Sequence, residues 1–274
     1  MEKRYYHICT KGISSDLFQD EEDFNQIIFI LSLVFGRTSG VEIVAYCIMN
    51  NHIHIIVYGH RENIEKRFLE LKKMYSMWYA NKYRIPKILA RNPHIIRQCE
   101  DNEDLKNCIG YVYANPVRAG LSTNAYYYPW SSISAHFRDE WSNPTTGTVV
   151  RYLRGSAKKL HTHQQIPDYL RLIEKGRIDP ACIVNTKLAE SALRTSKTLL
   201  YFVTRKDSQM TNPKETEFLC NDESARAKAS EIVFQLCGGT ISLNSLPSNI
   251  RTKVADILRY NYGTPLPIIK RILG

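Results

Sequence analysis

Two histidines separated by one residue, His52 and His54, are the side chains of this sequence best suited to binding a metal ion. They lie in residues 43–58, an apolar segment interrupted at residues 49–51, and this pattern predicts two strands joined by a tight turn. Side chains alternate faces along a strand, so both imidazoles would point to one face. Neutral imidazoles are common metal ligands. Two polar residues on the exposed face of an edge strand would give the same pattern.

Tyr111 and Asn115, four residues apart, form a second pair with chemical potential. Residues 104–114 have a helical apolar pattern, and residues four apart share one face of a helix. An asparagine carbonyl beside two imidazoles would complete a mixed nitrogen and oxygen ligand set that suits Mg²⁺ or Mn²⁺. A tyrosine beside such an ion is a credible nucleophile toward phosphorus. A buried core tyrosine is the alternative interpretation of Tyr111. Pro116 disfavours helical angles at Asn115, so a bend is expected there.

The elements that would position these residues follow a simple order. A strand is predicted over residues 5–10. A helix is predicted to follow, with the acidic residues 20–23 at its N-terminus, apolar residues at helical spacing after them, and Gly36 as its stop. The two strands of the histidine hairpin come next, then a helix over residues 63–83 and a strand over residues 94–100. This order predicts an α+β fold: a ferredoxin-like antiparallel sheet with helices packed on one side, followed by a small helical C-terminal region.

Changes in composition and in turn content along the chain predict a division into three regions. Residues 1–140 hold the sheet domain, and a turn-rich stretch at residues 141–147 marks its end. Residues 141–215 are predicted to be a basic linker with short helical pieces. Residues 216–274 are predicted to be a helical C-terminal unit.

The composition favours a polyanionic partner. The chain has 274 residues and a formal net charge of +10, with a pI near 9.2, and such a balance indicates nucleic acid. No long apolar run or basic amphipathic terminal helix supports a membrane role, and no signal-peptide core precedes the first strand. Seven cysteines, with no C-x-x-C pair, fit reduced thiols. We therefore expect a cytoplasmic, nucleoid-associated protein with no membrane association.

Three ordered motifs link the chain to a known family. They are YCIMNNHIHIIV at residues 46–57, YVYANPVRAGL at residues 111–121 and YPWSS at residues 128–132. Together they resemble the single-tyrosine transposases of the insertion-sequence-200 type, and the REP-associated tyrosine transposases in particular, over residues 5–138. The resemblance implies a histidine–hydrophobic–histidine (HUH) endonuclease core. It also implies a metal-dependent single-strand DNA endonuclease and strand transferase that acts beside imperfect hairpins.

The resemblance also implies roles for individual residues. His52 and His54 would take the metal positions, Asn115 would be the third ligand, and Mg²⁺ or Mn²⁺ would be the cofactor. Tyr111 would attack a DNA phosphodiester, which leaves a 5′-phosphotyrosine on the protein and a free 3′-hydroxyl. Tyr113 is the alternative nucleophile, but two residues further along a helix it would face elsewhere.

Two segments depart from the family pattern. Residues 88–94 read ILARNPH where relatives commonly show a Gly-Arg-Phe stretch. Residues 248–274 resemble the helix-turn-helix tail of long members, but stop where the recognition helix is expected. A non-catalytic, domesticated hairpin-binding regulator is therefore the alternative function, and a replication-type relaxase is a third. Long members of the family can act as single chains, so a monomer is favoured over a homodimer.

Other basic residues and histidines receive plainer interpretations. His60 and His136 are expected at the surface, and the second H-x-H pair, His161 and His163, is expected in a solvated loop. DNA contacts are predicted for a set of cationic residues: Lys11, Arg67, Lys72, Lys73, Arg97 and Arg118.

Overall fold

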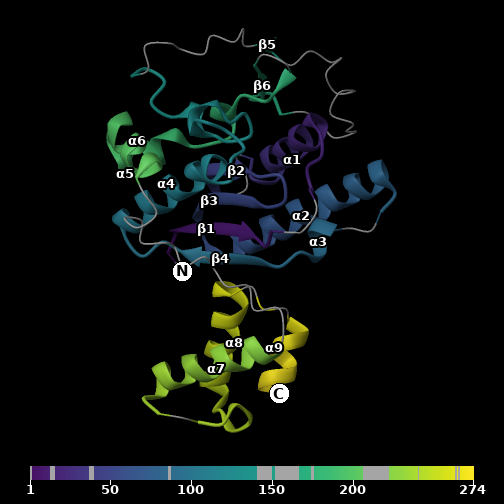
Figure 1. Ribbon diagram of the computed structural model, residues 1–274, viewed down its shortest axis with the longest axis vertical. Helices are drawn as coiled ribbons and strands as arrows, with labels where there is room; N and C mark the ends of the chain where they lie inside the picture. The colour runs from purple at the N-terminus through teal and green to yellow at the C-terminus, as the bar shows by residue number, and fades with distance from the viewer. Residues whose placement is uncertain are drawn as a thin grey trace.

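The computed structural model has a four-stranded antiparallel sheet at its centre, with strands in the order β2-β3-β1-β4 (Figure 1). The structure describes residues 2–12, 16–36, 40–85, 88–140, 150–151, 167–173, 176–205, 222–239, 241–262, 264 and 266–274. The first elements are β1 (Arg4–Thr10), α1 (Glu21–Val34), β2 (Glu42–Ile48), β3 (Ile53–Gly59), α2 (Arg61–Tyr83), α3 (Ile88–Arg91), β4 (His94–Gln98) and α4 (Asn102–Arg118). Apart from the short α3, β1 to β4 follow the βαββαβ order of a ferredoxin-like fold, so the predicted fold class is confirmed.

One face of the sheet is the apolar core beneath α1 and α2. Ile8 at the centre of β1 pairs with Ile55 of β3 and with Ile96 of β4, and all three side chains are fully buried. Burying an isoleucine side chain stabilises the fold by about 1.5–3 kcal/mol. α1 starts where the Asp20 carboxylate accepts a hydrogen bond from the backbone N–H of Asp23, which is a standard N-cap.

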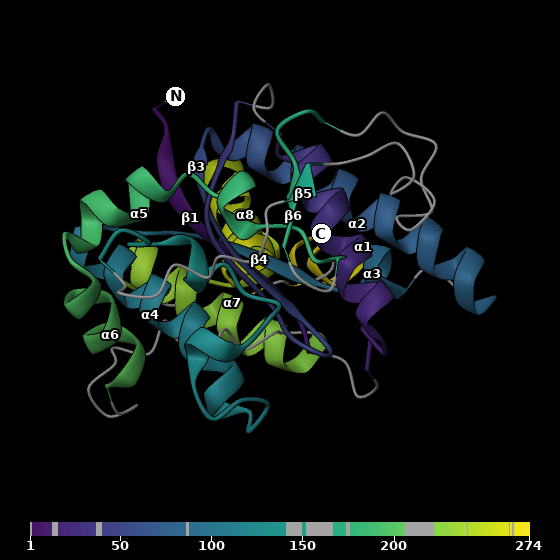
Figure 2. The same cartoon turned by 90° about the horizontal axis from the view of Figure 1, so that it is seen from above.

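The opposite face of the sheet is covered by α4. In Figure 2, α4 lies on one side of the strands with α5 (Thr186–Leu193) and α6 (Ser196–Thr204), and α1 and α2 lie on the other side. The prediction that the two helices of the βαββαβ order pack on one side of the sheet holds for α1 and α2, and α4 covers the other face. The reason is that α4 has a broad apolar surface, which includes Leu105, Ile109 and Val112 and which only packing can bury.

Two local predictions about the site elements also need correction. The structure continues α4 past Pro116 to Arg118, because the proline removes one hydrogen bond near the helix end and the N–H of Ala119 still donates to the carbonyl of Asn115 at 2.9 Å. The turn between β2 and β3 is closed by the N–H of Met49, which donates to the carbonyl of His52 at 2.9 Å. His52 is thus the last turn residue, and β3 begins one residue later.

Described residues cover both edges of the sheet, and covered edges are protected from pairing with another chain. At the β2 edge, Val184 forms a parallel bridge with Ile43, and the N–H of Asn185 donates to the carbonyl of Ile43 at 2.7 Å. At the β4 edge, α8 (Ser248–Asn261) packs against the strand, and Arg259 of α8 forms an ion pair with Glu65 of α2 at 2.8 Å.

The C-terminal unit has an apolar cluster of its own. α7 (Asp222–Cys237), α8 and α9 (Leu266–Leu273) surround buried residues such as Ile232, Val254 and Ile272, and Figure 1 shows them below β4. The described helices of residues 186–204 instead share the cluster of the sheet, while the division into three parts stays a prediction. The remaining short elements are β5 (Val150–Arg151), β6 (Arg171–Leu172), η1 (Ala125–Tyr127), η2 (Ile133–Ala135), η5 (Pro180–Cys182) and η7 (Leu243–Ser245). Across the described ranges, every helix is too short or too polar to cross a bilayer.

Replacing Gly110 by alanine is expected to destabilise the packing of α6 on α4. A Cβ at Gly110 would lie 2.4 Å from the carbonyl oxygen of Phe202, so the two helices would have to separate. Overpacking of this kind costs about 1–3 kcal/mol. The clash is with backbone atoms of Phe202, so we expect the cost to exceed the gain of about 1 kcal/mol in helix propensity. Urea unfolding measures the change. Gly239→Ala is the control, because a Cβ there meets nothing within 4 Å.

Candidate active site

The two predicted histidines and Tyr111 converge between the sheet and α4. The ring centroid of His54 lies 4.7 Å from that of His52 and 5.6 Å from that of Tyr111, and both ring pairs meet edge to face. A third imidazole, His7 of β1, lies 6.0 Å from the Tyr111 ring. His54 and His7 are buried, whereas His52 and Tyr111 are half-buried. The phenol is therefore neither enclosed in apolar packing nor separated from the histidines.

One stripe of α4 presents polar side chains to this face of the sheet. Five side chains spaced three or four residues apart lie along one side of the helix. They are Asp104, Cys108, Tyr111, Asn115 and Arg118. At its N-terminal end, both oxygens of Asp104 accept hydrogen bonds from the guanidinium of Arg97, at 2.8 and 3.0 Å. This bidentate pair ties α4 to β4. At its C-terminal end, the guanidinium carbon of Arg118 lies 5.3 Å from the Tyr111 ring centroid.

The donor atoms of the proposed ligands are consistent with a divalent cation. Nε2 of His54 is buried and has no hydrogen-bond partner within the described part of the chain. Nδ1 of His52 lies 2.7 Å from Oδ1 of Asn51. That nitrogen is therefore engaged in a hydrogen bond, and Nε2 is the nitrogen left to bind a metal ion. Nδ2 of Asn115 donates to the carbonyl of Tyr111 at 2.8 Å, and Oδ1 remains. Two imidazole nitrogens and an amide oxygen fit Mg²⁺ or Mn²⁺ with further oxygen ligands.

The imidazoles are in the neutral state that metal binding requires. Burial lowers the pKa of His52 to about 4. Burial, the charge of Arg97 and a smaller opposing effect of Asp104 bring the pKa of His7 to about 3. The pKa of His54 lies well below its usual value because of burial and the neighbouring His52 and His7. At neutral pH all three rings therefore keep a lone pair.

Sequence reasoning missed His7, which belongs to this cluster. Nε2 of His7 lies 3.1 Å from Nδ1 of His54, and the thiol of Cys9 lies within 4.8 Å of a nitrogen of each ring. The only signal in the sequence was a histidine within the first strand. Its proximity to His54 follows from the pairing of β1 with β3, in which Cys9 faces His54.

Tyr113, the alternative nucleophile, points away from the histidines into the core. Its hydroxyl lies 2.9 Å from Oγ of Ser132 and 2.7 Å from Nε2 of His136. Burial raises the pKa of Tyr113 well above its usual value, although the hydrogen bond with Ser132 opposes this effect. His136 is fully buried, so its predicted surface position is wrong. It is held inside because the Tyr113 hydroxyl satisfies its ring nitrogen.

The stability of the protein is expected to fall in acid partly through His136. Burial and the charge of Arg138 lower its pKa to about 4, against 6.5 in the unfolded chain. The unfolded state thus binds more protons below pH 6.5, and stability is lost as the pH falls toward 4. Between pH 7 and 4, the wild type should lose about 3 kcal/mol more unfolding free energy than His136→Gln. Urea titrations at several pH values test this, and parallel curves would contradict it.

The predicted DNA-contact residues fall in different environments. Lys72 is buried, and its ammonium donates to the carbonyl of Asn92 at 2.5 Å. Its predicted DNA contact stays a prediction, for which the side chain would have to leave this position. Arg97 is engaged by Asp104, and Arg67 pairs with Glu70 at 2.9 Å. Arg67 and the exposed Lys73 both lie on α2, across the sheet from Tyr111.

Lys11 and Arg118 both lie close to candidate site residues, and the guanidinium carbon of Arg118 is 5.3 Å from the Tyr111 ring centroid. Lys11 precedes Gly12, where a Cβ would be 3.9 Å from Nδ1 of His52. Residues 88–94, which depart from the family pattern, form α3 and the start of β4. His161 and His163, and the boundary at residues 141–147, lie outside the described residues.

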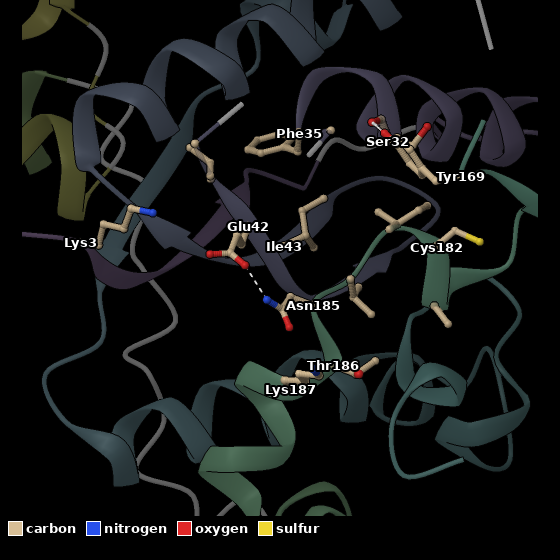
Figure 3. A pocket seen from close by; sticks show the side chains of 16 residues that line it. Lys3, Ser32, Phe35, Glu42, Ile43, Tyr169, Cys182, Asn185, Thr186 and Lys187 are labelled. Carbon is tan, nitrogen blue, oxygen red and sulfur yellow. Dashed lines mark hydrogen bonds between the residues drawn. The ribbon is translucent and has the colours of Figure 1, made fainter. Parts of the chain in front are cut away.

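A cavity of about 450 Å³ at the β2 edge lies away from these residues (Figure 3). Its lining includes Lys3, Tyr169 and Lys187, and the Nδ2 of Asn185 donates to a carboxylate oxygen of Glu42 across it. Glu42 begins β2, whereas Cys47, which pairs with His54, lies near the other end of that strand. The polar contacts in this cavity hold residues 183–185 on the edge strand.

Comparisons with known proteins give one distant match in sequence and one match in structure. Over 113 residues, 36% of this chain, the sequence is 30% identical to a protein of Haemophilus influenzae described as a REP-associated tyrosine transposase. The match spans 62% of that relative's length. No family model matches the chain. A solved structure of a REP-associated tyrosine transposase bound to a REP hairpin aligns with 48% of this chain and 76% of its own, at 18% identity and a TM-score of 0.38. The chain is thus similar in sequence to a REP-associated tyrosine transposase.

Proposed function

We propose that this chain is a metal-dependent single-strand DNA endonuclease and strand transferase of the transposase type, acting beside DNA hairpins. One observation carries the proposal: the ring of Tyr111 lies 5.6 Å from the ring of His54 and on the same side of the sheet as His52. A nucleophile and two neutral imidazoles thereby converge from separate elements. The similarity to a REP-associated tyrosine transposase supports hairpin-forming DNA as the substrate.

His52, His54 and Asn115 would hold Mg²⁺ or Mn²⁺. When bound, such an ion polarises a phosphate and offsets negative charge in the transition state. Nε2 of His54 is buried and has no hydrogen-bond partner among the described residues, which supports this assignment. A buried polar atom without a partner costs about 1–3 kcal/mol.

The chain's own residues would carry out the transfer. The Tyr111 oxygen forms a bond to phosphorus as the bond from phosphorus to the 3′-oxygen breaks, and the proton lost by the phenol is balanced by the one the 3′-oxygen gains. A 5′-phosphotyrosine and a free 3′-hydroxyl result. The ester keeps the energy of the broken bond, so the hydroxyl of the same strand or another can reverse the step. Arg118, 5.3 Å from the ring, would attract the phosphate.

We further propose that a single chain forms the site, in the cytoplasm and on the nucleoid. Tyr111 meets the histidines of its own chain, so no exchange of helices between two copies is needed. Mass measurement in solution tests the monomer.

The proposed activity is tested by incubating the protein with a labelled single strand that contains a hairpin, with Mn²⁺ or with EDTA. The expected product is a labelled adduct that survives denaturation and forms only with Mn²⁺. Hairpin binding without any adduct would favour the non-catalytic hairpin-binding regulator instead.

A further inference from the structure

The buried ring of His54 is engaged at one nitrogen only. Its Nδ1 lies 3.1 Å from Nε2 of His7, and the two rings are nearly parallel, with an interplanar angle of 14°. Its Nε2 is buried and lacks a partner among the residues with described positions. The orientation of His54 is therefore set by a residue 47 positions earlier in the chain, on the neighbouring strand β1.

A hydrogen bond between two neutral imidazoles has only two possible directions. If His7 donates, His54 carries its proton on Nε2, and this N–H is buried without an acceptor. If His54 donates from Nδ1, its Nε2 keeps the lone pair that a metal ion requires. Only the second direction leaves the buried Nε2 of His54 with a lone pair that a metal ion can bind. The ring of His7 faces Nδ1 of His54 with its Nε2, 3.1 Å away, so that nitrogen is the acceptor in the second direction.

We propose that His7 is a positioning residue, which accepts the hydrogen bond from Nδ1–H of His54 and fixes the tautomer whose Nε2 binds a divalent cation. The proposal rests on the proposed function for the cation. Asn51 does the same for the other ligand, because its Oδ1 lies 2.7 Å from Nδ1 of His52. Each metal-binding histidine thus has its own orienting partner, an arrangement typical of metal sites.

A direct role of His7 in metal binding is the competing interpretation. Nitrogens of His7 and His54 and the sulfur of Cys9 lie within 4.8 Å of one another. A thiolate among them would favour a softer ion such as Zn²⁺. That arrangement would use Nδ1 of His54 and leave its buried Nε2 without a partner, which is why we favour the orienting role.

Two measurements on the full chain without DNA test the proposal. The first is the Mn²⁺ dissociation constant, read from the paramagnetic resonance signal of the free ion. His7→Phe should bind Mn²⁺ about 10–100-fold more weakly, as expected when an orienting partner is lost. His7→Gln, whose amide oxygen can accept the same hydrogen bond, should bind more tightly than His7→Phe. Cys9→Ala should leave the Mn²⁺ affinity unchanged.

The second measurement is the tautomer of His54, from long-range ¹H–¹⁵N spectra of the metal-free protein at neutral pH. The wild type and His7→Gln should carry the proton on Nδ1, and His7→Phe should lose this preference. An Nε2–H tautomer in the wild type would overturn the proposal. So would an unchanged Mn²⁺ affinity in folded His7→Phe, or a loss in Cys9→Ala as large as that in His7→Phe.

Failure of this proposal is distinguishable from failure of the proposed function. Absence of a DNA adduct with a His7-dependent Mn²⁺ affinity would refute only the strand-transfer activity. Adduct formation together with the same Mn²⁺ affinity in the wild type and in His7→Phe would refute only the positioning role. Thermal unfolding of each variant shows whether it is folded before its affinity is compared.

Discussion

Tyr111→Phe is expected to lose covalent capture of DNA completely and to cleave hairpin-containing single strands at least about a thousandfold more slowly. The substitution removes only the oxygen that forms the bond to phosphorus. The ring is half-buried and keeps its contacts with His54 and His7, so the fold and hairpin binding should persist. Denaturing gels of the labelled strand over time measure both adduct and cleavage.

Tyr113→Phe is the matched control, since it removes the same atom from the same helix two residues away. The Tyr113 hydroxyl is buried against Ser132 and His136, and losing its two hydrogen bonds should cost about 1–3 kcal/mol of stability. Adduct formation by the folded variant should stay near the wild-type level. If Tyr113→Phe abolished the adduct and Tyr111→Phe kept it, the roles assigned to the two tyrosines would be reversed.

His52→Gln and His54→Gln are each expected to weaken Mn²⁺ binding by about 100-fold or more and to remove cleavage at micromolar metal. The loss of a ligand should exceed the loss of about 10–100-fold that follows from removing an orienting partner. Isothermal titration with Mn²⁺ gives the affinity, and binding of a fluorescent hairpin in EDTA should be unchanged because the fold remains.

His60→Gln serves as the control for these variants. His60 precedes α2 and its side chain makes no capping hydrogen bond, so both metal affinity and cleavage should match the wild type. Wild-type cleavage in EDTA, or normal cleavage by both folded ligand variants, would contradict a metal-dependent reaction at this position.

The sequence predicted the elements of the fold because local signals are strong there. Acidic caps, apolar periodicity and the turn predicted at residues 49–51 identified β1 to β4 and the long helices α1, α2 and α4 to within a few residues, whereas the short α3 was not predicted. The proximity of His54 to Tyr111 was also foreseen, although through the resemblance and not through spacing. Nothing in the periodicity of residues 104–114 shows on which face of the sheet that helix lies.

The features that were missed depend on contacts between distant segments. His7 lies beside His54 because of the register in which β1 pairs with β3. His136 is buried because Tyr113, 23 residues earlier, supplies a partner. Lys72 is buried because a carbonyl 20 residues later, that of Asn92, accepts a hydrogen bond from its ammonium. In each case tertiary pairing offsets the cost of burying a polar group, and a sequence pattern does not contain that partner.

The most direct test of the central claim is to locate the DNA phosphate on the protein. After reaction with a hairpin-containing single strand and Mn²⁺, nuclease and trypsin leave a modified peptide of residues 107–118, which contains both tyrosines. Fragment masses that separate Tyr111 from Tyr113 identify the modified residue. The account predicts a 5′-phosphodiester on Tyr111 alone. A phosphate on Tyr113, or hairpin binding with no modified peptide at all, would contradict it.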